Sequence, residues 1–195
     1  MSETYLDGKL LVAMPGIGDD RFSRSVIFMC AHSGDGAMGL IINQEIQNLS
    51  FSGLMERLAL LPDDEAIRLP QKLASMPVLQ GGPVETSRGF VLHSRDYFSD
   101  ECTLDINGNV GLTATLDVLR AIAAGKGPQR SLLALGYAGW GPGQLEAEIK
   151  QNGWLYCEPD DSLLFDQDVA GKYTAALSRI GVNEAVLSTG QFGHA

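Results

Sequence analysis

The chain has 195 residues, of which 45% are hydrophobic and 19% charged, and its 24 acidic and 14 basic side chains give a formal net charge of −10. The hydrophobic fraction excludes an intrinsically disordered chain, and the length predicts a single compact domain over residues 1–195. The negative charge disfavours direct binding to nucleic acids and to anionic membranes, because both attract proteins through Lys and Arg.

The sequence shows no pattern for secretion, membrane insertion or metal binding. The apolar run at residues 10–14 is too short for a signal peptide, and no stretch approaches the roughly 20 apolar residues that span a bilayer. Cys30, Cys102 and Cys157 are too widely spaced for a zinc site or a disulfide framework. We therefore expect a cytoplasmic protein with reduced thiols, no metal and no cofactor.

The N-terminal part of the chain predicts a strand, a β-hairpin and a helix. Residues 9–14 form the first predicted strand. Residues 25–31 are a nearly continuous apolar run typical of a buried strand, and a glycine-rich turn leads to a returning strand over 40–43. A helix is predicted over 49–61, because apolar side chains recur on one of its faces; Ser50 or Ser52 would cap it and Pro62 would end it.

Two further hairpins and a helix are predicted in the middle of the chain. The first hairpin joins residues 77–80 to 89–94 through the loop GGPVETSR. The second occupies 102–112, where apolar and polar residues alternate around Asn107 and Gly108, a strong turn signal. The apolar stripe that follows predicts a helix over 113–124.

The C-terminal part alternates strands and helices. Strands are predicted at 131–137 and 154–158, and helices at 144–152 and 169–180, with Asp168 capping the last helix and an acidic connector before it. Residues 183–195 are expected to be a partly mobile tail. Because hairpins alternate with helices, the predicted fold is α+β with a mixed, largely antiparallel sheet.

Three glycine-rich segments carry most of the polar residues that favour a binding or catalytic role. In the first, His32 follows a strand and Asp19 and Asp20 precede it; His32 can act as a base or ligand near neutral pH, or cap a turn through backbone carbonyls. In the second, Arg88 favours a small-anion site with Glu85 and His93 nearby, although a Glu85–Arg88 pair that pins a hairpin is the alternative.

The third segment, residues 135–155, places a glycine-rich loop before a helix. An anion can bind at such a helix N-terminus, but the loop lacks the Lys-Ser/Thr of a P-loop and the spacing of a dinucleotide fingerprint. Close packing of the backbone is the alternative role of these glycines. Trp140, beside Tyr137, favours either a pocket wall or an anchor for a partner.

The three segments resemble the YqgE/AlgH family of small bacterial cytoplasmic proteins. The matching blocks are PGIGDDRFSRSVIFMCAHSGDGAMGLIIN, LQGGPVETSRGFVLH and LGYAGWGPGQLEAEIKQNGWL, in the order of the family. The resemblance implies an α+β fold with a mixed, partly barrel-like sheet flanked by helices. It brings no established catalytic residues, but it marks Asn43 and Gln144 as further motif positions. One branch has a name linked to alginate production and transcription, which in so acidic a chain implies regulation through a protein partner.

We therefore expect a non-catalytic binding or regulatory module that contacts a protein partner or a small anionic ligand. The first alternative is an enzyme that uses His32 with Asp20, or His93 with Arg88; the second is a transcriptional regulator. One hypothesis gathers Asp20, His32, Arg88 and Trp140 into a common recess. The full set of candidate ligand-binding residues is Asp20, His32, Asn43, Glu85, Arg88, His93, Tyr137, Trp140 and Gln144.

Overall fold

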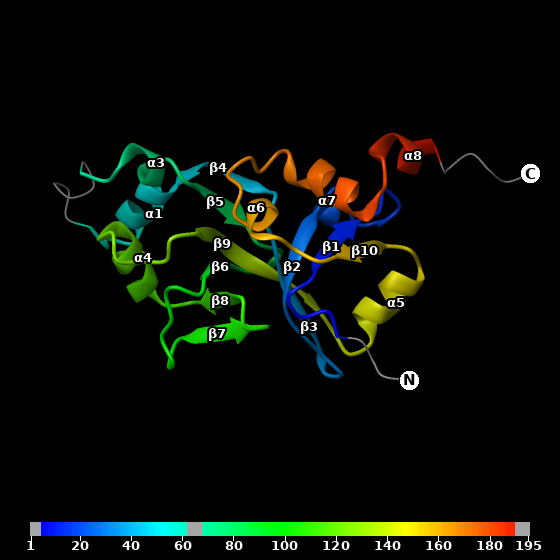
Figure 1. The fold of residues 1–195 in the computed structure, drawn as a ribbon, viewed down its shortest axis with the longest axis horizontal. Helices are drawn as coiled ribbons and strands as arrows, with labels where there is room; N and C mark the ends of the chain where they lie inside the picture. Colours follow the sequence, from blue (N-terminus) through cyan, green and yellow to red (C-terminus); the bar gives the residue numbers. More distant parts are fainter. Residues whose placement is uncertain (1–4, 62–67, 190–195) are drawn as a thin grey trace, which may run out of the picture.

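A long, curled sheet organises the computed structural model, which describes residues 5–61 and 68–189 (Figure 1). The strands follow the order β10-β1-β2-β3-β9-β6-β8-β7, and each neighbouring pair in this order is antiparallel. Strand β5 pairs with β9 in parallel and with β4 in antiparallel orientation. The strands are β1 (Leu10–Ala13), β2 (Val26–Ser33), β3 (Gly36–Ile41), β4 (Glu45–Ser50), β5 (Pro77–Gln80), β6 (Val84–Ser94), β7 (Thr103–Ile106), β8 (Val110–Thr113), β9 (Ser131–Trp140) and β10 (Trp154–Cys157).

Helices cover the sheet from several sides, which confirms the predicted α+β class with a partly barrel-like, mixed sheet (Figure 1). Helices α1, α3 and α4 lie at one end of the molecule, α5 lies at the other, and α6 and α7 lie along one side. The helical elements are η1 (Asp20–Phe22), α1 (Phe51–Arg57), α3 (Gln71–Ala74), α4 (Leu116–Ala123), α5 (Gln144–Lys150), α6 (Asp161–Leu164), α7 (Lys172–Ile180) and α8 (Glu184–Thr189).

The central strands are buried on both faces, which explains their continuous apolar runs. In β2, Val26 and Phe28 belong to the apolar core inside the curled sheet, together with residues of α6 and α7. The alternate residues Ile27 and Met29 belong to a second core, which includes Leu145 of α5. Successive side chains of a strand point to opposite faces, so burial of both faces requires apolar residues at consecutive positions.

A third core lies under the helices at the other end of the sheet. It combines Phe51 and Met55 of α1 with Val118 of α4 and Val78 of β5. Strand β9 serves both ends, because Leu133 belongs to this third core while Ala138 and Trp140 belong to the core under α5. The burial pattern of β9 therefore ties the two ends of the sheet together.

Strand β9 changes its neighbour at Gly136. Before this glycine, residues 133–135 pair with β5, and after it residues 138–140 pair with β3. Gly136 has a positive φ of 75°, and a Cβ atom there would lie 2.5 Å from the carbonyl oxygen of Gly82. Gly81 lies between β9 and β3, since its N–H donates to the carbonyl of Leu135 and its carbonyl accepts from the N–H of Ile41. The crossing therefore requires glycines, which have no Cβ atom.

The predicted hairpin between residues 77–80 and 89–94 is wrong. These segments are β5 and the second half of β6, but β9 lies between them and pairs with both. The physical reason is the same close approach: Gly81 and Gly82 let the chain cross β9 at its bend instead of turning back on itself. Part of the predicted loop, from Val84 onward, continues β6 past an irregularity in its register.

Other boundaries differ where tertiary pairing extends a strand or packing starts a helix. Residues 45–50 form β4 before α1 begins, so the helix predicted from residue 49 starts later, with Ser50 as its cap; Pro62 lies outside the described residues. Thr113 ends β8 rather than starting a helix. Strand β9 continues through Trp140, α6 forms within the acidic connector, and α8 occupies part of the predicted mobile tail.

The first hairpin and the 102–112 hairpin are confirmed. Strands β2 and β3 pair around the glycine-rich turn, and β7 and β8 pair around Asn107 and Gly108. These two residues have positive φ angles of 53° and 71°, and the N–H of Asn109 donates to the carbonyl of Ile106, as in a type I′ turn. Across residues 5–61 and 68–189, the structure contains no helix with the length and apolar character needed to cross a membrane.

We expect Gly136→Ala to lower the free energy of unfolding by about 3 kcal/mol or more, because the added methyl group meets the Gly82 carbonyl and the backbone keeps a strained φ. Urea denaturation followed by circular dichroism measures this loss. Gly16→Ala is the matched control, since a Cβ atom at Gly16 has no neighbour within 4 Å. Equal stabilities of the two variants would contradict the requirement for glycine where β9 passes close to Gly82.

Candidate functional site

One carboxylate on α5 holds both tryptophans of the chain. Oε2 of Glu148 accepts the indole N–H of Trp140 at 2.9 Å and that of Trp154 at 2.8 Å. Oε1 of the same carboxylate accepts from Gln144 at 2.9 Å. The two indoles meet edge to face with centroids 5.9 Å apart, and Phe22 packs against both. Both tryptophan side chains are buried, so Trp140 packs α5 onto the sheet and is not an exposed anchor for a partner.

His32 is buried beside the same helix, and hydrogen bonds fix its tautomer. Its Nδ1 accepts the backbone N–H of Leu6 at 3.1 Å, and its Nε2 lies 2.9 Å from Oε1 of Glu146. Because Nδ1 accepts, the proton is on Nε2 and is donated to Glu146. The predicted partner Asp20 is exposed on η1, and the predicted backbone carbonyl contacts are replaced by an amide and a carboxylate. Both ring nitrogens are therefore engaged.

The carboxyl group of Glu146 is held ionised by this arrangement. Its own backbone N–H lowers the pKa of the Glu146 carboxyl, and the hydrogen bond from His32 lowers it further. His32 and Trp140 thus contact successive carboxylates of α5, at positions 146 and 148. Spacing alone does not reveal this role, because residues two apart on a helix point in different directions.

The second segment forms a separate cluster on β6. Arg88 pairs with Glu85 at 3.3 Å, with both side chains more than half exposed, and its guanidinium lies over the ring of Phe90 at 5.3 Å. Phe90 meets Tyr137 edge to face. This is the pair that the alternative role of the segment predicts, although it pins an irregular part of β6 rather than a hairpin.

His93 is fully buried and structurally satisfied. Its Nδ1 lies 3.0 Å from the carbonyl oxygen of Ser94, and its Nε2 lies 2.8 Å from the hydroxyl of Thr113, which bonds in turn to Thr103. The carbonyl can only accept, so Nδ1 donates to it and Nε2 accepts from Thr113. Burial lowers the pKa of His93 and favours this neutral form. The predicted pairing of His93 with Arg88 is therefore not formed.

The remaining candidates also have local structural partners. Asn43 ties the start of β2 to the end of β3, because its side chain accepts from Val26 and donates to the carbonyl of Arg24, each at 2.8 Å. Gln144 accepts the N–H of Gly141 at 3.0 Å and thereby fixes the loop before α5. The structure thus brings Trp140 and Gln144 together and places Tyr137 near Arg88.

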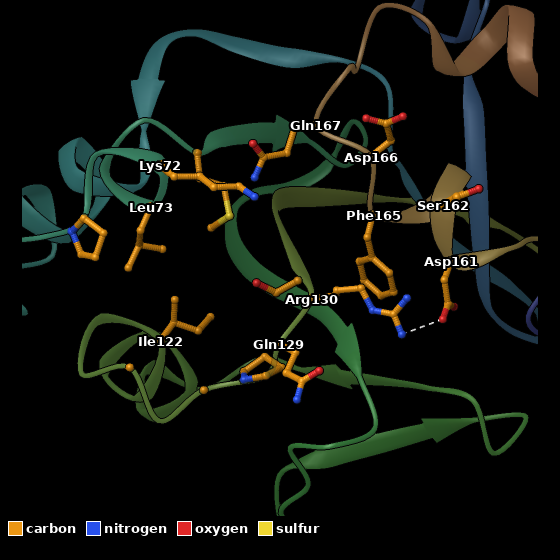
Figure 2. A pocket seen from close by; sticks show the side chains of 16 residues that line it. Lys72, Leu73, Ile122, Gln129, Arg130, Asp161, Ser162, Phe165, Asp166 and Gln167 are labelled. Atoms are coloured by element: carbon orange, nitrogen blue, oxygen red, sulfur yellow. Dashed lines mark ion pairs between the residues drawn. The ribbon is translucent and has the colours of Figure 1, made fainter.

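A cavity among the described residues lies elsewhere, and none of the nine candidate residues lines it. It has a volume of about 1070 Å³ and opens between α3, the loop that precedes β9, and α6 (Figure 2). Lys72 and Leu73 form one wall, Phe165 and Asp161 form the opposite wall, and Arg130 lies between them. The hypothesis of a recess shared by Asp20, His32, Arg88 and Trp140 does not describe this cavity.

Arg130 is positioned through its side chain and through its backbone. Its guanidinium forms an ion pair with Asp161 at 2.7 Å and lies over the ring of Phe165, 5.7 Å from the centroid (Figure 2). Its backbone N–H donates to the Ser94 hydroxyl at 3.1 Å, and the preceding N–H, of Gln129, donates to Asp96 at 2.9 Å. These bonds attach the loop to the end of β6, so the arginine is held before any ligand binds.

A buried lysine lies behind this cavity. Lys172, the first residue of α7, is 2% exposed and lines a second, smaller cavity of about 20 Å³. Its Nζ donates to the carbonyl oxygen of Leu164 at 2.8 Å. Burial lowers the pKa of Lys172 to about 8, and the nearby carboxylate of Asp166 offsets part of that shift. Lys172 is therefore the most perturbed amine among the described residues.

The sequence gives little signal for this cavity. Its lining comes from three separate segments, at residues 70–76, 122–131 and 161–167, and all three lie outside the motif blocks. Arg130 stands out in the sequence only as one end of the densest basic spacing, which begins at Lys126. Lys172 lies on the polar side of the predicted apolar stripe, so its burial depends on the packing of α6 against α7.

Burial makes the thiols of Cys30 and Cys157 harder to ionise. Cys30 is buried in β2, and burial raises the pKa of its thiol to about 12. Burial also raises the pKa of Cys157. Among residues 5–61 and 68–189, no three His, Cys, Asp or Glu side chains are grouped to hold a metal ion.

Comparisons with known proteins place the chain among bacterial relatives. A family model described as AlgH-like matches residues 10–185. A UPF0301 protein of Methylocella silvestris is 56% identical over 191 residues, covering 98% of this chain and 92% of the relative. A UPF0301 protein of Bradyrhizobium diazoefficiens is 55% identical over 194 residues, covering 100% of this chain and 90% of the relative.

Two solved structures share the fold. The solution structure of the AlgH protein from Pseudomonas aeruginosa matches with a TM-score of 0.77 and 42% identity, covering 100% of this chain and 98% of that chain. The crystal structure of protein DIP2367 from Corynebacterium diphtheriae matches with a TM-score of 0.66 and 18% identity, over 89% of this chain and 88% of that chain. At that identity, the second likeness concerns the fold alone.

We expect Glu148→Ala to lower the free energy of unfolding by about 2–3 kcal/mol, because two buried indole N–H groups lose their acceptor. The chain has only 2 tryptophans, and both bond to Glu148, so a shift of the tryptophan emission to longer wavelength reports the change directly. Glu56→Ala, on the exposed face of α1, is the control. An unchanged emission spectrum in the Glu148 variant would contradict the two hydrogen bonds from the tryptophans to Glu148.

The perturbed amine of Lys172 predicts a pH dependence of stability. Its pKa is about 8 in the folded chain and 10.5 at its ordinary value, so between these values the unfolded chain binds a proton that the folded chain does not. Raising the pH through this range therefore stabilises the folded form. Relative to Lys172→Met, the wild type should gain up to about 3 kcal/mol, measured by denaturation between these two pH values. Parallel pH profiles of the two proteins would refute the shift.

Proposed function

The chain belongs to the AlgH-like family, and on that premise we propose that it is a non-catalytic binding module whose cavity holds a small organic anion. The observation that carries this proposal is the placement of Arg130. Its guanidinium is oriented by Asp161 and Phe165 at the wall of a cavity of about 1070 Å³. Pockets for small molecules typically have volumes of about 300–1,000 Å³, so the space suits a metabolite-sized ligand.

The charges around the cavity support an anionic ligand. The two cavities are lined by three basic side chains, Lys72, Arg130 and Lys172, and by two acidic ones, Asp161 and Asp166. The rest of the chain is strongly acidic, with a net charge of −10. A carboxylate or phosphate is therefore attracted to this region in preference to most other parts of the surface.

Arg130 has donors left for a ligand. A guanidinium carries five N–H donors in a planar fork, and the ion pair with Asp161 engages one side of that fork. Stacking on Phe165 keeps the plane fixed, so little side-chain entropy is lost when a ligand oxygen binds. The mixed lining, with Leu73 and Ile122 on the side away from Asp161, suits a ligand that has one anionic and one apolar end.

The bonding of the histidines supports a non-catalytic role. A histidine that acts as a general acid or base needs a ring nitrogen within reach of the substrate. In His32 the nitrogens bond to Leu6 and Glu146, and in His93 they bond to Ser94 and Thr113. The two pairs on which an enzymatic reading depends, His32 with Asp20 and His93 with Arg88, are absent from the described structure.

We expect a thermal-shift screen of small carboxylates and phosphates to find ligands of the wild type. Isothermal titration calorimetry should then show that Arg130→Gln binds these ligands at least about tenfold more weakly. Loss of a hydrogen bond to a charged group costs about 1.5–3 kcal/mol, which corresponds to this loss of affinity. Arg120→Gln is the matched control, because Arg120 pairs with Asp117 on the exposed face of α4 and does not line the cavity.

A second variant separates the two candidate anion sites. Arg88→Gln should bind the same ligands with wild-type affinity, since Arg88 lies on β6 against Glu85 and Phe90. If Arg88→Gln loses binding and Arg130→Gln does not, the ligand binds at β6 and the cavity is not the site. If no small anion binds the wild type at millimolar concentration, the proposed function is wrong.

A further inference from the structure

The position of Lys172 goes beyond what anion binding requires. Its side chain is buried and lines the small cavity of about 20 Å³. The apolar residues Leu79 of β5, Leu132 of β9 and Val169, which precedes α7, line the same cavity. The small and large cavities share five lining residues, which are Met76, Ser131, Phe165, Asp166 and Gln167. The two cavities therefore adjoin, and Lys172 lines the smaller one.

The surroundings of Lys172 favour an uncharged amine. An ammonium group has three donors, whereas its one hydrogen-bond partner here is the carbonyl oxygen of Leu164. The charged group that faces it is Asp166, an exposed residue that also lines both cavities. A buried ammonium with incomplete partners is costly, and the lowered pKa of about 8 agrees with this cost. At pH 7 the amine of Lys172 is then neutral in about one molecule in ten.

Neutral, desolvated lysines are nucleophiles toward carbonyl groups. We propose that Lys172 captures the carbonyl group of the ligand as a reversible imine, and that the ligand is therefore a small oxo acid whose carboxylate binds Arg130. The inference rests on the proposed function, because it uses the same cavity and the same arginine. It adds the chemical class of the ligand and a second contact residue.

The bond changes balance without any further reactant. The lone pair on Nζ of Lys172 attacks the carbonyl carbon, and the carbonyl oxygen takes up a proton to give a carbinolamine. Loss of the hydroxyl group with one proton from nitrogen releases water and leaves a carbon–nitrogen double bond. The sum is amine plus carbonyl to imine plus water, with no oxidation or reduction. A cavity of about 20 Å³ has room for one water-sized group beside the amine. Hydrolysis reverses the reaction, so this is covalent binding without turnover.

The experiment traps the imine with cyanoborohydride. The full-length protein is incubated with glyoxylate and the reductant near pH 7.5, and the adduct is counted by intact mass and located by peptide mapping. We expect one carboxymethyl group per chain on Lys172, formed about tenfold or more faster than on exposed lysines, because a larger fraction of this amine is neutral. An uncharged aldehyde, propanal, should label Lys172 more slowly, since it lacks the carboxylate that binds Arg130.

Variants identify the residue and test the site. Lys172→Met and Lys172→Arg should lose the rapid adduct, whereas Lys150→Met, which changes an exposed lysine of α5 that lines neither cavity, should keep it. Two variants are used because either one alone could disturb packing, and mapping of the wild-type adduct does not depend on their folding. Adducts distributed evenly over exposed lysines, or an unchanged rate in both Lys172 variants, would overturn the inference.

A ligand without a carbonyl group separates this inference from the proposed function. Glycolate keeps the carboxylate of glyoxylate but cannot form an imine. If glycolate binds in a way that depends on Arg130 while glyoxylate gives no rapid adduct, the imine is wrong and the anion site stands. If glyoxylate labels Lys172 at the same rate in the wild type and in Arg130→Gln, the amine is reactive but the proposed anion site is wrong.

Discussion

Three backbone segments approach one another without intervening side chains where β9 bends, and the rest of the molecule is arranged around this contact. Gly81 bonds to β9 on one side and to β3 on the other, and Gly136 packs its α-carbon against the carbonyl of Gly82. Because β9 can exchange β5 for β3 at this point, one strand runs through both ends of the sheet. The core under α1 and α4 and the core under α5 are thereby parts of one continuous structure.

This constraint also explains the structural roles of the most distinctive segments of the sequence. The blocks rich in glycine are those in which the backbone must approach another strand, and the polar residues inside them bond to local partners. Glu148 accepts both indoles, Asn43 joins β2 to β3, and the Glu85–Arg88 pair lies on the irregular part of β6. A conspicuous motif can therefore report the geometry of the fold, and not a binding site.

The cavity with Arg130 is built by different means. Its walls come from short segments that the sheet holds apart, and its charged residues are balanced in pairs: Arg130 with Asp161, and Lys172 near Asp166. In the first pair, Asp161 positions the guanidinium of Arg130 without occupying all of its donors. Burial of Lys172 lowers the stability of the fold at neutral pH, and such a cost is commonly associated with a functional site. The binding proposal and the imine proposal both rest on this combination of position and cost.

The sequence by itself determined the elements whose signals are local. Asn107 and Gly108 fix a turn through their own φ angles, and the apolar run of β2 predicts a strand buried on two faces because both of its faces have to leave water. The α+β class and the family resemblance follow from such local signals. What only the tertiary structure decided is which distant segments meet. The insertion of β9 between β5 and β6, the bond from His32 to Glu146 and the burial of Lys172 depend on contacts between residues far apart in the chain. No local propensity encodes those contacts, since they arise from the packing of complete elements.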